Sequence, residues 1–326
     1  MINLDYKPPI AWRACAIPKK DGTSRYLLIP NDELKQAQRD VLDELYRNRD
    51  IKVHPAATGF IPFRSTFTGA GKHDRDTPLI IQLDVHNFFP SFPVSRVIDI
   101  LKLTDMEIAK IDYIEKYCIF HGKRRDQFPQ GSPTSPYLTN IGMYEVDEKL
   151  TGLAAAMGYR YTRYADDMAF SVKVSRSADP PEAKEHIINE AIGKKKALMT
   201  AVARTLEDQL GLTISWKKTL CAYANSPRVP RRILGITIRK DNLGYNAPKF
   251  MRRNARALVH NLWKELKDGK SKEELWPLYW KMMGLVGYSN SLRRKSDFIV
   301  SGFDPCIEKE KYDFIRREFG YANRSY

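Results

Sequence analysis

Two adjacent aspartates, Asp166 and Asp167, lie between aromatic and apolar residues in the stretch YRYTRYADDMAFSV, residues 159–172. Adjacent carboxylates in a folded turn repel each other, which raises their pKa values unless a cation relieves the repulsion. Oxygen ligands with no nearby Cys or His favour a hard ion, Mg²⁺ or Mn²⁺, which commonly binds substrate phosphates as well. The pair therefore indicates phosphoryl transfer, although a solvated hairpin turn can carry the same dipeptide.

A third carboxylate is needed to hold two metal ions about 4 Å apart, the arrangement that activates an attacking hydroxyl and stabilises a departing phosphate. Asp84 is the candidate, because it closes the apolar run PLIIQLDV, residues 78–85, where a charge is unusual. A hairpin over residues 159–172 that pairs beside this strand would bring Asp166 and Asp167 to Asp84. The apolar framing of both segments favours a metal site over a solvated turn.

Hydrophobic periodicity and turn residues predict the elements that position these carboxylates. We expect strands within residues 11–30 around a turn at Asp21-Gly22, and further strands over 78–85, 159–172, 213–223 and 231–238. We expect helices over 31–48, 94–103, 135–158 and 181–210, and from Pro248 to the end. The helix over 181–210 is either long or broken, and Gly211 closes it.

Composition indicates a globular protein with a polyanionic partner. Hydrophobic residues make up 43% of the 326 residues, enough for two or three subdomains with their own cores. The 54 Lys and Arg outnumber the 39 Asp and Glu, and the resulting charge of +15 favours nucleic acid over the simpler reading of a basic, solubilising surface.

Cysteine spacing and hydropathy bear on the compartment. Four scattered cysteines without a CxxC pair argue against a zinc ribbon and against a disulfide framework. The sequence has no apolar leader and no run of about 18 apolar residues. We therefore expect a cytoplasmic protein without a membrane partner.

The region after Pro248 has two faces at helical spacing. One face is apolar and carries Met251, Ala255, Leu258, Leu262 and Leu266. The other is basic and includes Lys249, Arg252, Arg253 and Arg256. Basic faces of this kind contact phosphates, although a solvated charge run on a helix exterior has the same pattern.

Several segments together resemble the reverse transcriptase family, in the order and spacing of its motifs. Motif A is similar to LDVHNFFPSF, motif B to FPQGSPTSPYLTN, motif C to YADD, motif D to GLTISWKKT and the primer-grip region to RILGITI. The opening fingers segments are similar to PKKDGTSRYLLIPNDELKQAQ and HPAATGFIPFRST. The resemblance covers roughly residues 12–245. One such motif would be weak, whereas the ordered set is strong.

The resemblance implies an α+β fold of the right-hand polymerase type, with fingers, a palm built on an antiparallel sheet, and a helical thumb. We expect the fingers in residues 1–80 with part of 100–130, the palm in 81–99 and 131–245, and the thumb in 246–326. We expect a minimal polymerase without ribonuclease H, endonuclease or integrase domains. Lys249, Arg252, Arg253 and Arg256 would then grip a template and primer duplex.

The resemblance also implies the metal site. Asp84 and Asp166 would bind two Mg²⁺ ions, for which Mn²⁺ is a substitute, with the Val85 carbonyl as a further oxygen ligand. Asp167 would complete the acidic cluster. Lys218 matches the motif D lysine that protonates the leaving pyrophosphate, and its neighbour Lys217 is the alternative.

Further matched residues would bind the incoming deoxynucleotide. Phe89 matches the family's steric gate, a ring that leaves no room for a 2′-hydroxyl. Gln130 and Gly131 match motif B residues that lie against the nucleotide. Arg25, helped by Lys20 or Lys19, matches the fingers cations on the triphosphate, where a guanidinium grips two oxygens.

Within the family, QGSPTSP and YTRYADD look most like bacterial retron reverse transcriptases, which copy part of a partner non-coding RNA and serve in phage defence. The implied partners are an RNA template, the DNA product, deoxynucleoside triphosphates and an effector protein. The retron segment Asn-Ala-x-x-His reads TGAGKH here, with Gly69 in place of asparagine, and ILG at 233–235 replaces Val-Thr-Gly. His73 in that segment is either an RNA contact or a structural histidine.

Four alternatives stay open. The departures from the retron pattern at TGAGKH and ILG leave room for another defence-associated reverse transcriptase or a relative of group II intron enzymes. An RNA-templated RNA polymerase is a second enzyme hypothesis, against which Phe89 argues. A catalytically dispensable RNA-binding protein is the alternative from another class, against which the intact set of Asp84, Asp166 and Asp167 argues.

Overall fold

The computed structural model describes residues 2–18, 22, 24–74, 76–174, 181–224, 226, 229–238, 245–246, 249–294 and 308–319. The chain divides into two compact units. Unit 1 comprises Met1–Asp74 and Pro78–Cys221, and unit 2 comprises Arg75–Thr77 and Ala222–Tyr326. Helices and antiparallel strands occur in both, which is the predicted α+β class. No helix in the described part of the chain is long and apolar enough to cross a membrane.

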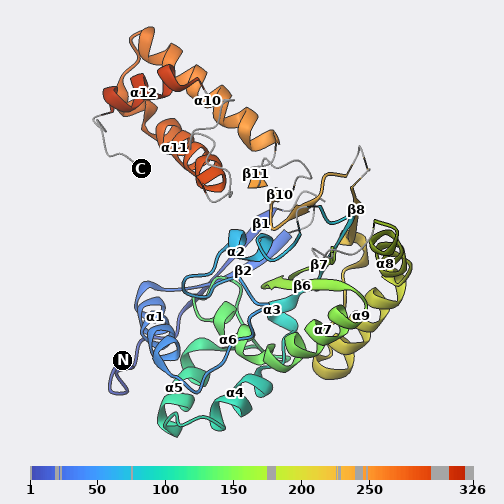
Figure 1. The fold of residues 1–326 in the computed structure, drawn as a ribbon. Coiled ribbons are helices and arrows are strands. Elements are labelled where there is room, and N and C mark those ends of the chain that lie inside the picture. Colours follow the sequence, from blue (N-terminus) through green and yellow to red (C-terminus); the bar gives the residue numbers. More distant parts are fainter. Residues whose placement is uncertain are drawn as a thin grey trace. The chain divides into compact units, whose positions relative to one another are not determined.

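A four-stranded sheet of order β6-β7-β3-β8 lies at the centre of unit 1 (Figure 1). Its strands are β6 (Tyr159–Tyr164), β7 (Asp167–Val172), β3 (Leu79–Asp84) and β8, which begins at Leu220 and ends at Tyr223. β7 pairs antiparallel with both β6 and β3. Leu79, Ile80 and Ile81 of β3 are fully buried, as expected for an apolar strand covered on both faces.

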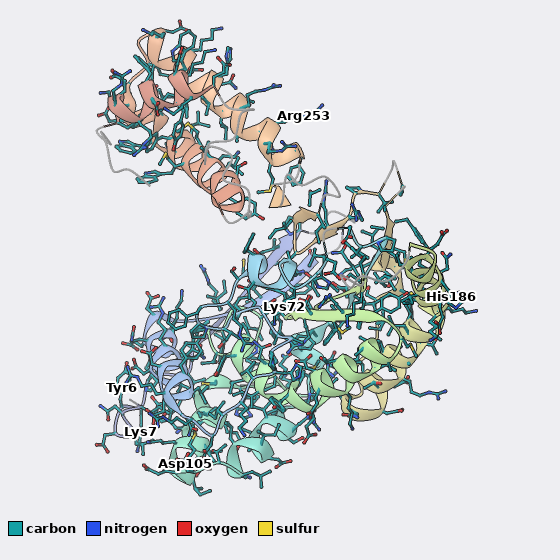
Figure 2. The ribbon with its side chains drawn as sticks, viewed as in Figure 1. Tyr6, Lys7, Lys72, Asp105, His186 and Arg253 are labelled. Atoms are coloured by element: carbon teal, nitrogen blue, oxygen red, sulfur yellow. The ribbon has the colours of Figure 1, made fainter. Side chains whose placement is uncertain are left out.

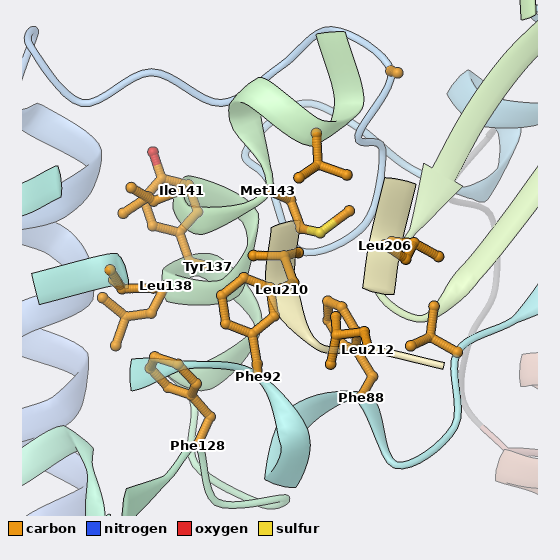
Figure 3. Packing of buried hydrophobic residues seen from close by; sticks show 14 of the residues in the cluster. Phe88, Phe92, Phe128, Tyr137, Leu138, Ile141, Met143, Leu206, Leu210 and Leu212 are labelled. Atoms are coloured by element: carbon orange, nitrogen blue, oxygen red, sulfur yellow. The ribbon is translucent and has the colours of Figure 1, made fainter. Parts of the chain in front are cut away.

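The helices of unit 1 supply most of its core. They are α1 (Asp32–Arg47), α2 (Thr66–Ala70), α3 (Phe88–Ser91), α4 (Val94–Lys102), α5 (Ile108–Cys118), α6 (Ser135–Gly142), α7 (Tyr144–Ala156), α8 (Pro181–Gly193) and α9 (Lys195–Leu210). Helices α7 and α9 lie along one face of the sheet (Figure 1). The rings of Phe88 and Phe128 meet Phe92 edge to face, with centroids 5.4 and 5.9 Å apart, in the core shown in Figure 3.

Two short antiparallel pairs complete unit 1. One joins β1 (Trp12–Pro18) to β2 (Ser24–Pro30), as predicted, while Asp21 of the predicted turn lies outside the described residues. The other joins β4 (Phe120–His121) to β5 (Asp126–Gln127). Helix α1 begins where the sequence predicts, because the Asn31 side chain accepts a hydrogen bond from the Leu34 amide at 3.1 Å.

Three predicted elements differ from the structure. The strand expected over 231–238 is divided by a turn at Leu234-Gly235, with φ of 53° and 79°, into the antiparallel strands Arg232–Ile233 and Ile236–Ile238. The single helix expected over 135–158 is divided at Met143 into α6 and α7. At this break the Gly142 carbonyl accepts a hydrogen bond from Nε of Arg96 at 2.9 Å, a distant side chain that local periodicity does not reveal. The strand expected over 213–223 is confined to β8, preceded by the 3-10 turn Trp216–Lys218.

Unit 2 contains a small sheet of order β11-β10-β9 and three helices. The strands are β9 (Arg232–Ile233), β10 (Ile236–Ile238) and β11 (Tyr245–Asn246). The helices are α10 (Lys249–Lys267), α11 (Lys272–Arg294) and α12 (Lys309–Glu318), within the region predicted to be helical from Pro248 to the end, of which residues 295–307 and 320–326 lie outside the described ranges. Ala255 and Leu262 of α10 are fully buried in the core of this unit, as the predicted apolar face requires.

Candidate active site

The strand register brings the three aspartates together. β7 pairs with β3 so that Asp167 is the direct partner of Asp84. Tyr164 and Asp167 are partners across β6 and β7, so Ala165 and Asp166 form a two-residue hairpin loop, in which Ala165 has a φ of 52°. The Val85 amide donates a hydrogen bond to the Asp166 carbonyl at 3.1 Å. This contact connects the loop to the residue that follows β3.

The three carboxylates perturb one another. Burial raises the pKa of Asp166, the negative charge of Asp84 raises it further, and the Lys218 and Arg25 cations partly oppose the rise. Burial raises the pKa of Asp167 to about 6, with further contributions from the charges of Asp166 and Asp84. Such repulsion is the condition that a bound cation relieves.

Lys218 already places a cation in this cluster. Its Nζ donates to Asp84 Oδ1 at 2.7 Å and to Oδ2 at 3.0 Å, while the side chain stays 56% exposed. The chain around it is fixed to β3, because the Ser215 amide donates to the Asp84 carbonyl at 2.7 Å and the His86 amide donates to the Thr213 carbonyl at 2.8 Å. Backbone contacts therefore hold the motif D segment against the end of β3.

The donor set fits a hard divalent ion. Asp84, Asp166 and Asp167 offer only oxygen, and burial together with the neighbouring carboxylate charges raises the pKa values of Asp166 and Asp167, which a bound cation would oppose. Among the described residues, no three His, Cys, Asp or Glu side chains are arranged so that they could hold a metal ion. In this structure Lys218 occupies the Asp84 carboxylate. The predicted ligand Val85 is 2% exposed beside them.

The β1–β2 hairpin and the motif B turn meet next to this site. The Leu28 amide of β2 donates to the Gln130 carbonyl at 2.7 Å. Gly131 has a φ of 121°, and a Cβ added to it would lie 2.8 Å from the Leu28 carbonyl oxygen. Arg25 is exposed on β2, and its charge acts on Asp166. Lys20, predicted to assist Arg25, lies outside the described residues.

Phe89 lies in α3, the helix that follows β3. Asn87 adopts a left-handed conformation with a φ of 46° immediately before α3. Phe89 is the second residue of α3, is half-buried, and packs against Phe88 with ring centroids 5.3 Å apart. The turn at Asn87 therefore determines where the ring lies relative to Asp84.

His73 lies inside unit 1. It is 2% exposed, and its ring nitrogens lie 2.7 Å from Ser171 Oγ and 2.7 Å from Thr162 Oγ1. Burial lowers its pKa from 6.5 to about 3. In this arrangement the ring connects the segment after α2 to both β6 and β7.

The predicted nucleic-acid contacts of α10 belong to unit 2. Arg253 and Arg256 are exposed, and Arg253 projects from the helix in Figure 2. Arg252 is half-buried. The side chain of Lys249 lies outside the described residues.

Sequence reasoning missed a buried group beside the loop that carries Asp166. Arg163 of β6 is 1% exposed and forms an ion pair with Asp147 of α7, and both side chains are inaccessible to solvent. The sequence YRYTRY could have revealed this ion pair, because an arginine among the aromatic residues of a buried strand needs a charged partner.

Residues 17–238 match the family described as reverse transcriptase (RNA-dependent DNA polymerase), more than half of the chain. The chain therefore belongs to the reverse transcriptase family, and the predicted family is confirmed. With the observed α+β architecture, the right-hand polymerase fold class is confirmed as well.

Curated relatives are retron reverse transcriptases. That of retron Mx162 from Myxococcus xanthus is 30% identical over 283 residues, which cover 82% of this chain and 55% of the relative. The reverse transcriptase of retron Mx65 from the same organism is 37% identical over 175 residues, which cover 48% of this chain and 39% of the relative. The reverse transcriptase of retron Ec86 from Escherichia coli is 26% identical over 302 residues, which cover 91% of this chain and 82% of the relative. The chain thus spans about half or less of the two Myxococcus relatives.

Among solved structures, the chain is similar to a telomerase from Candida albicans in complex with a fragment of telomeric RNA. The sequences are 10% identical, and the match covers 95% of this chain and 59% of the telomerase chain with a TM-score of 0.45. A similarity at this level carries no argument about function.

Proposed function

We propose that this protein is an RNA-directed DNA polymerase that copies a partner non-coding RNA into DNA by two-metal phosphoryl transfer. The observation that carries the proposal is the β3–β7 register, in which Asp167 faces Asp84 and Asp166 occupies the adjoining loop. Membership of the reverse transcriptase family supports the reaction class. The similarity to retron reverse transcriptases supports the retron type. A defined RNA template and a role in bacterial anti-phage defence with an effector protein, in the cytoplasm, are part of the proposal.

In this proposal Asp84, Asp166 and the Val85 carbonyl hold two Mg²⁺ ions, or Mn²⁺ in their place, and Asp167 completes the acidic cluster. When bound, the ions would supply activation of the attacking hydroxyl and charge neutralisation of the phosphates. Lys218 moves from Asp84 to the leaving pyrophosphate and donates a proton to it. The donor is well placed for this role, because its Nζ lies 2.7 Å from Asp84 Oδ1 and its side chain is half-exposed.

The remaining site residues select and orient the nucleotide. Arg25 and Lys20 bind the triphosphate, and Gln130 and Gly131 lie against the nucleotide. Phe89 excludes a 2′-hydroxyl. The contact of Leu28 with Gln130 supports a shared pocket for the first two groups, because it fixes β2 to the motif B turn.

The subdomain assignment is part of the proposal. Fingers comprise residues 1–80 with part of 100–130, the palm 81–99 and 131–245, and the thumb 246–326. Lys249, Arg252, Arg253 and Arg256 of the thumb contact nucleic acid in this assignment. His73 of the fingers takes the structural role instead, because it is buried and both its ring nitrogens are engaged within unit 1. The exposed charges of Arg253 and Arg256 support the thumb contacts, since phosphate contacts require accessible cations.

Sequencing of the nucleic acid that copurifies with the protein tests the template. The nucleic acid is sequenced before and after addition of Mg²⁺ and deoxynucleotides. We expect one defined RNA, and DNA copied from an internal segment of it. Random or absent RNA would contradict a retron-type template.

The variant Phe89→Ala tests sugar selection. Removing the ring should raise the incorporation of ribonucleotides relative to deoxynucleotides by at least about tenfold, because the gate rejects the 2′-hydroxyl by occupying its space. The neighbouring exposed residue gives the control His86→Ala, which should keep the original ratio. Equal use of both sugars by the unmodified protein would favour an RNA polymerase instead.

A further inference from the structure

A buried ion pair lies directly behind the loop that carries Asp166. Arg163 donates from Nε to Asp147 Oδ1 at 2.9 Å and from Nη2 to Oδ2 at 2.6 Å, a bidentate pair with no accessible side-chain surface. Tyr161 donates its hydroxyl to Asp147 Oδ1 at 2.8 Å. The carboxylate therefore aligns the guanidinium from one side, in a geometry with little freedom to rotate.

The free edge of the guanidinium reaches the catalytic loop. Nη1 of Arg163 donates to the Ala165 carbonyl at 3.1 Å and to Asn140 Oδ1 at 2.9 Å. The Ala165 carbonyl belongs to the peptide that enters Asp166. On the other side, the Asp166 carbonyl accepts from the Val85 amide. Both peptides that flank Asp166 are thus held, one by a side chain and one by β3.

The loop has a conformation that needs such support. Ala165 has a φ of 52°, which is unfavourable for a residue with a Cβ by about 1 kcal/mol. The hydrogen bond from Arg163 to the Ala165 carbonyl stabilises this conformation against one with a negative φ.

Stability alone is a weak explanation for the pair. Burying two charges carries a desolvation cost that the mutual attraction often only balances, and apolar residues of similar volume are frequently as stable. A satisfied polar network does confer rigidity. This network extends to the backbone beside the loop, because Asn140 Nδ2 donates to the Gly59 carbonyl and the Thr58 amide donates to the Arg163 carbonyl.

We propose that Arg163 is a positioning residue whose guanidinium, aligned by Asp147, fixes the Ala165–Asp166 peptide and thereby the direction of the Asp166 carboxylate. This inference rests on the proposed function, because it assigns Asp166 to the reaction. The role requires arginine. A lysine ammonium can pair with Asp147, but it lacks the planar fork that reaches Asp147, Asn140 and Ala165 together.

The first experiment compares Arg163→Lys with Arg160→Lys. Arg160 lies on the same strand, but its Nε donates to Asp74 Oδ2 at 3.0 Å rather than to the loop. Single-nucleotide incorporation on an RNA template is measured well below the unfolding midpoint of each variant. Arg163→Lys should lower kcat by about tenfold to a hundredfold with KM for the nucleotide little changed, as expected for misplaced reacting groups. Arg160→Lys should retain kcat within about threefold.

A second variant separates position from folding. The double substitution Arg163→Met with Asp147→Leu replaces the pair by apolar residues and removes the donor to Ala165, and its unfolding midpoint is measured beside its kcat. We expect a folded protein with the same loss of kcat as Arg163→Lys. Full kcat in either folded variant overturns the inference. An unmodified protein that makes no DNA overturns the proposed function and the inference together, whereas active unmodified protein with active variants overturns only the inference.

Discussion

Replacement of Gly131 by alanine tests how the motif B turn holds the β1–β2 hairpin. The added Cβ would lie 2.8 Å from the Leu28 carbonyl oxygen and 3.3 Å from its carbon. Both atoms belong to the backbone of β2, so they cannot give way as a flexible side chain can. The alternatives are a shift of β2, which carries Arg25, or a shift of the turn itself.

The magnitude follows from two terms. A φ of 121° is rarely adopted by residues with a side chain, and such conformations cost about 1–3 kcal/mol. A shift of Leu28 also weakens the bond from its amide to the Gln130 carbonyl, which contributes about 1 kcal/mol. The free energy of unfolding should therefore fall by about 2–4 kcal/mol.

Gly211→Ala is the matched control. Gly211 also has a positive φ, 63°, but no atom lies within 4 Å of an added Cβ. This variant should lose only about 1 kcal/mol, the cost of a left-handed alanine. Chemical denaturation measures both variants, and nucleotide KM is measured in parallel. Only Gly131→Ala should raise KM, because only it displaces Arg25 and Gln130. Equal stability losses with unchanged KM would refute the close contact.

Three further predictions concern charge. In metal-free protein, the unmodified chain should lose stability as pH rises from 3.8 to 6, because folded Asp167 keeps a proton that the unfolded chain has released; Asp167→Asn does not titrate and should therefore gain stability over it. Solvent screening of this partly exposed side chain limits the gain to about 1 kcal/mol, measured by thermal unfolding. His73→Ala should lower the free energy of unfolding by about 2–4 kcal/mol near neutral pH. The difference from the unmodified protein should narrow below pH 6.5, because the histidine of the unfolded chain then takes up a proton that the buried ring does not. The double variant Arg253→Glu with Arg256→Glu should bind a duplex more weakly and with a smaller salt dependence, measured by titration at several salt concentrations. Its free energy of unfolding should stay within about 0.5 kcal/mol of that of the unmodified protein.

The central part of the site could be predicted from sequence because it depends on local patterns. An apolar run long enough for one buried strand ends at Asp84, and a hairpin with alternating apolar residues brackets Asp166 and Asp167. Two strands of one sheet place their ends together once they pair. The observed register, with Asp84 opposite Asp167, follows from that pairing.

The supporting contacts could not be predicted because their partners are distant in sequence. The salt bridge of Lys218 with Asp84 spans 134 positions, and the bond of Asn140 to Gly59 spans 81. The break between α6 and α7 has the same origin, since Arg96 binds the Gly142 carbonyl across 46 positions. Periodicity describes one element at a time, whereas these contacts depend on how elements pack.

Primer extension on an RNA template tests the central claim most directly. The unmodified protein, Asp84→Asn and Asp166→Asn are each given a primed RNA template, deoxynucleotides and Mg²⁺, and extended DNA is measured after each variant is shown to be folded. We expect DNA synthesis that requires Mg²⁺ and that falls by at least about a hundredfold in both variants, since both carboxylates would hold the metal ions that neutralise the reacting phosphate. Undiminished synthesis by folded Asp166→Asn, or none by the unmodified protein, would contradict it.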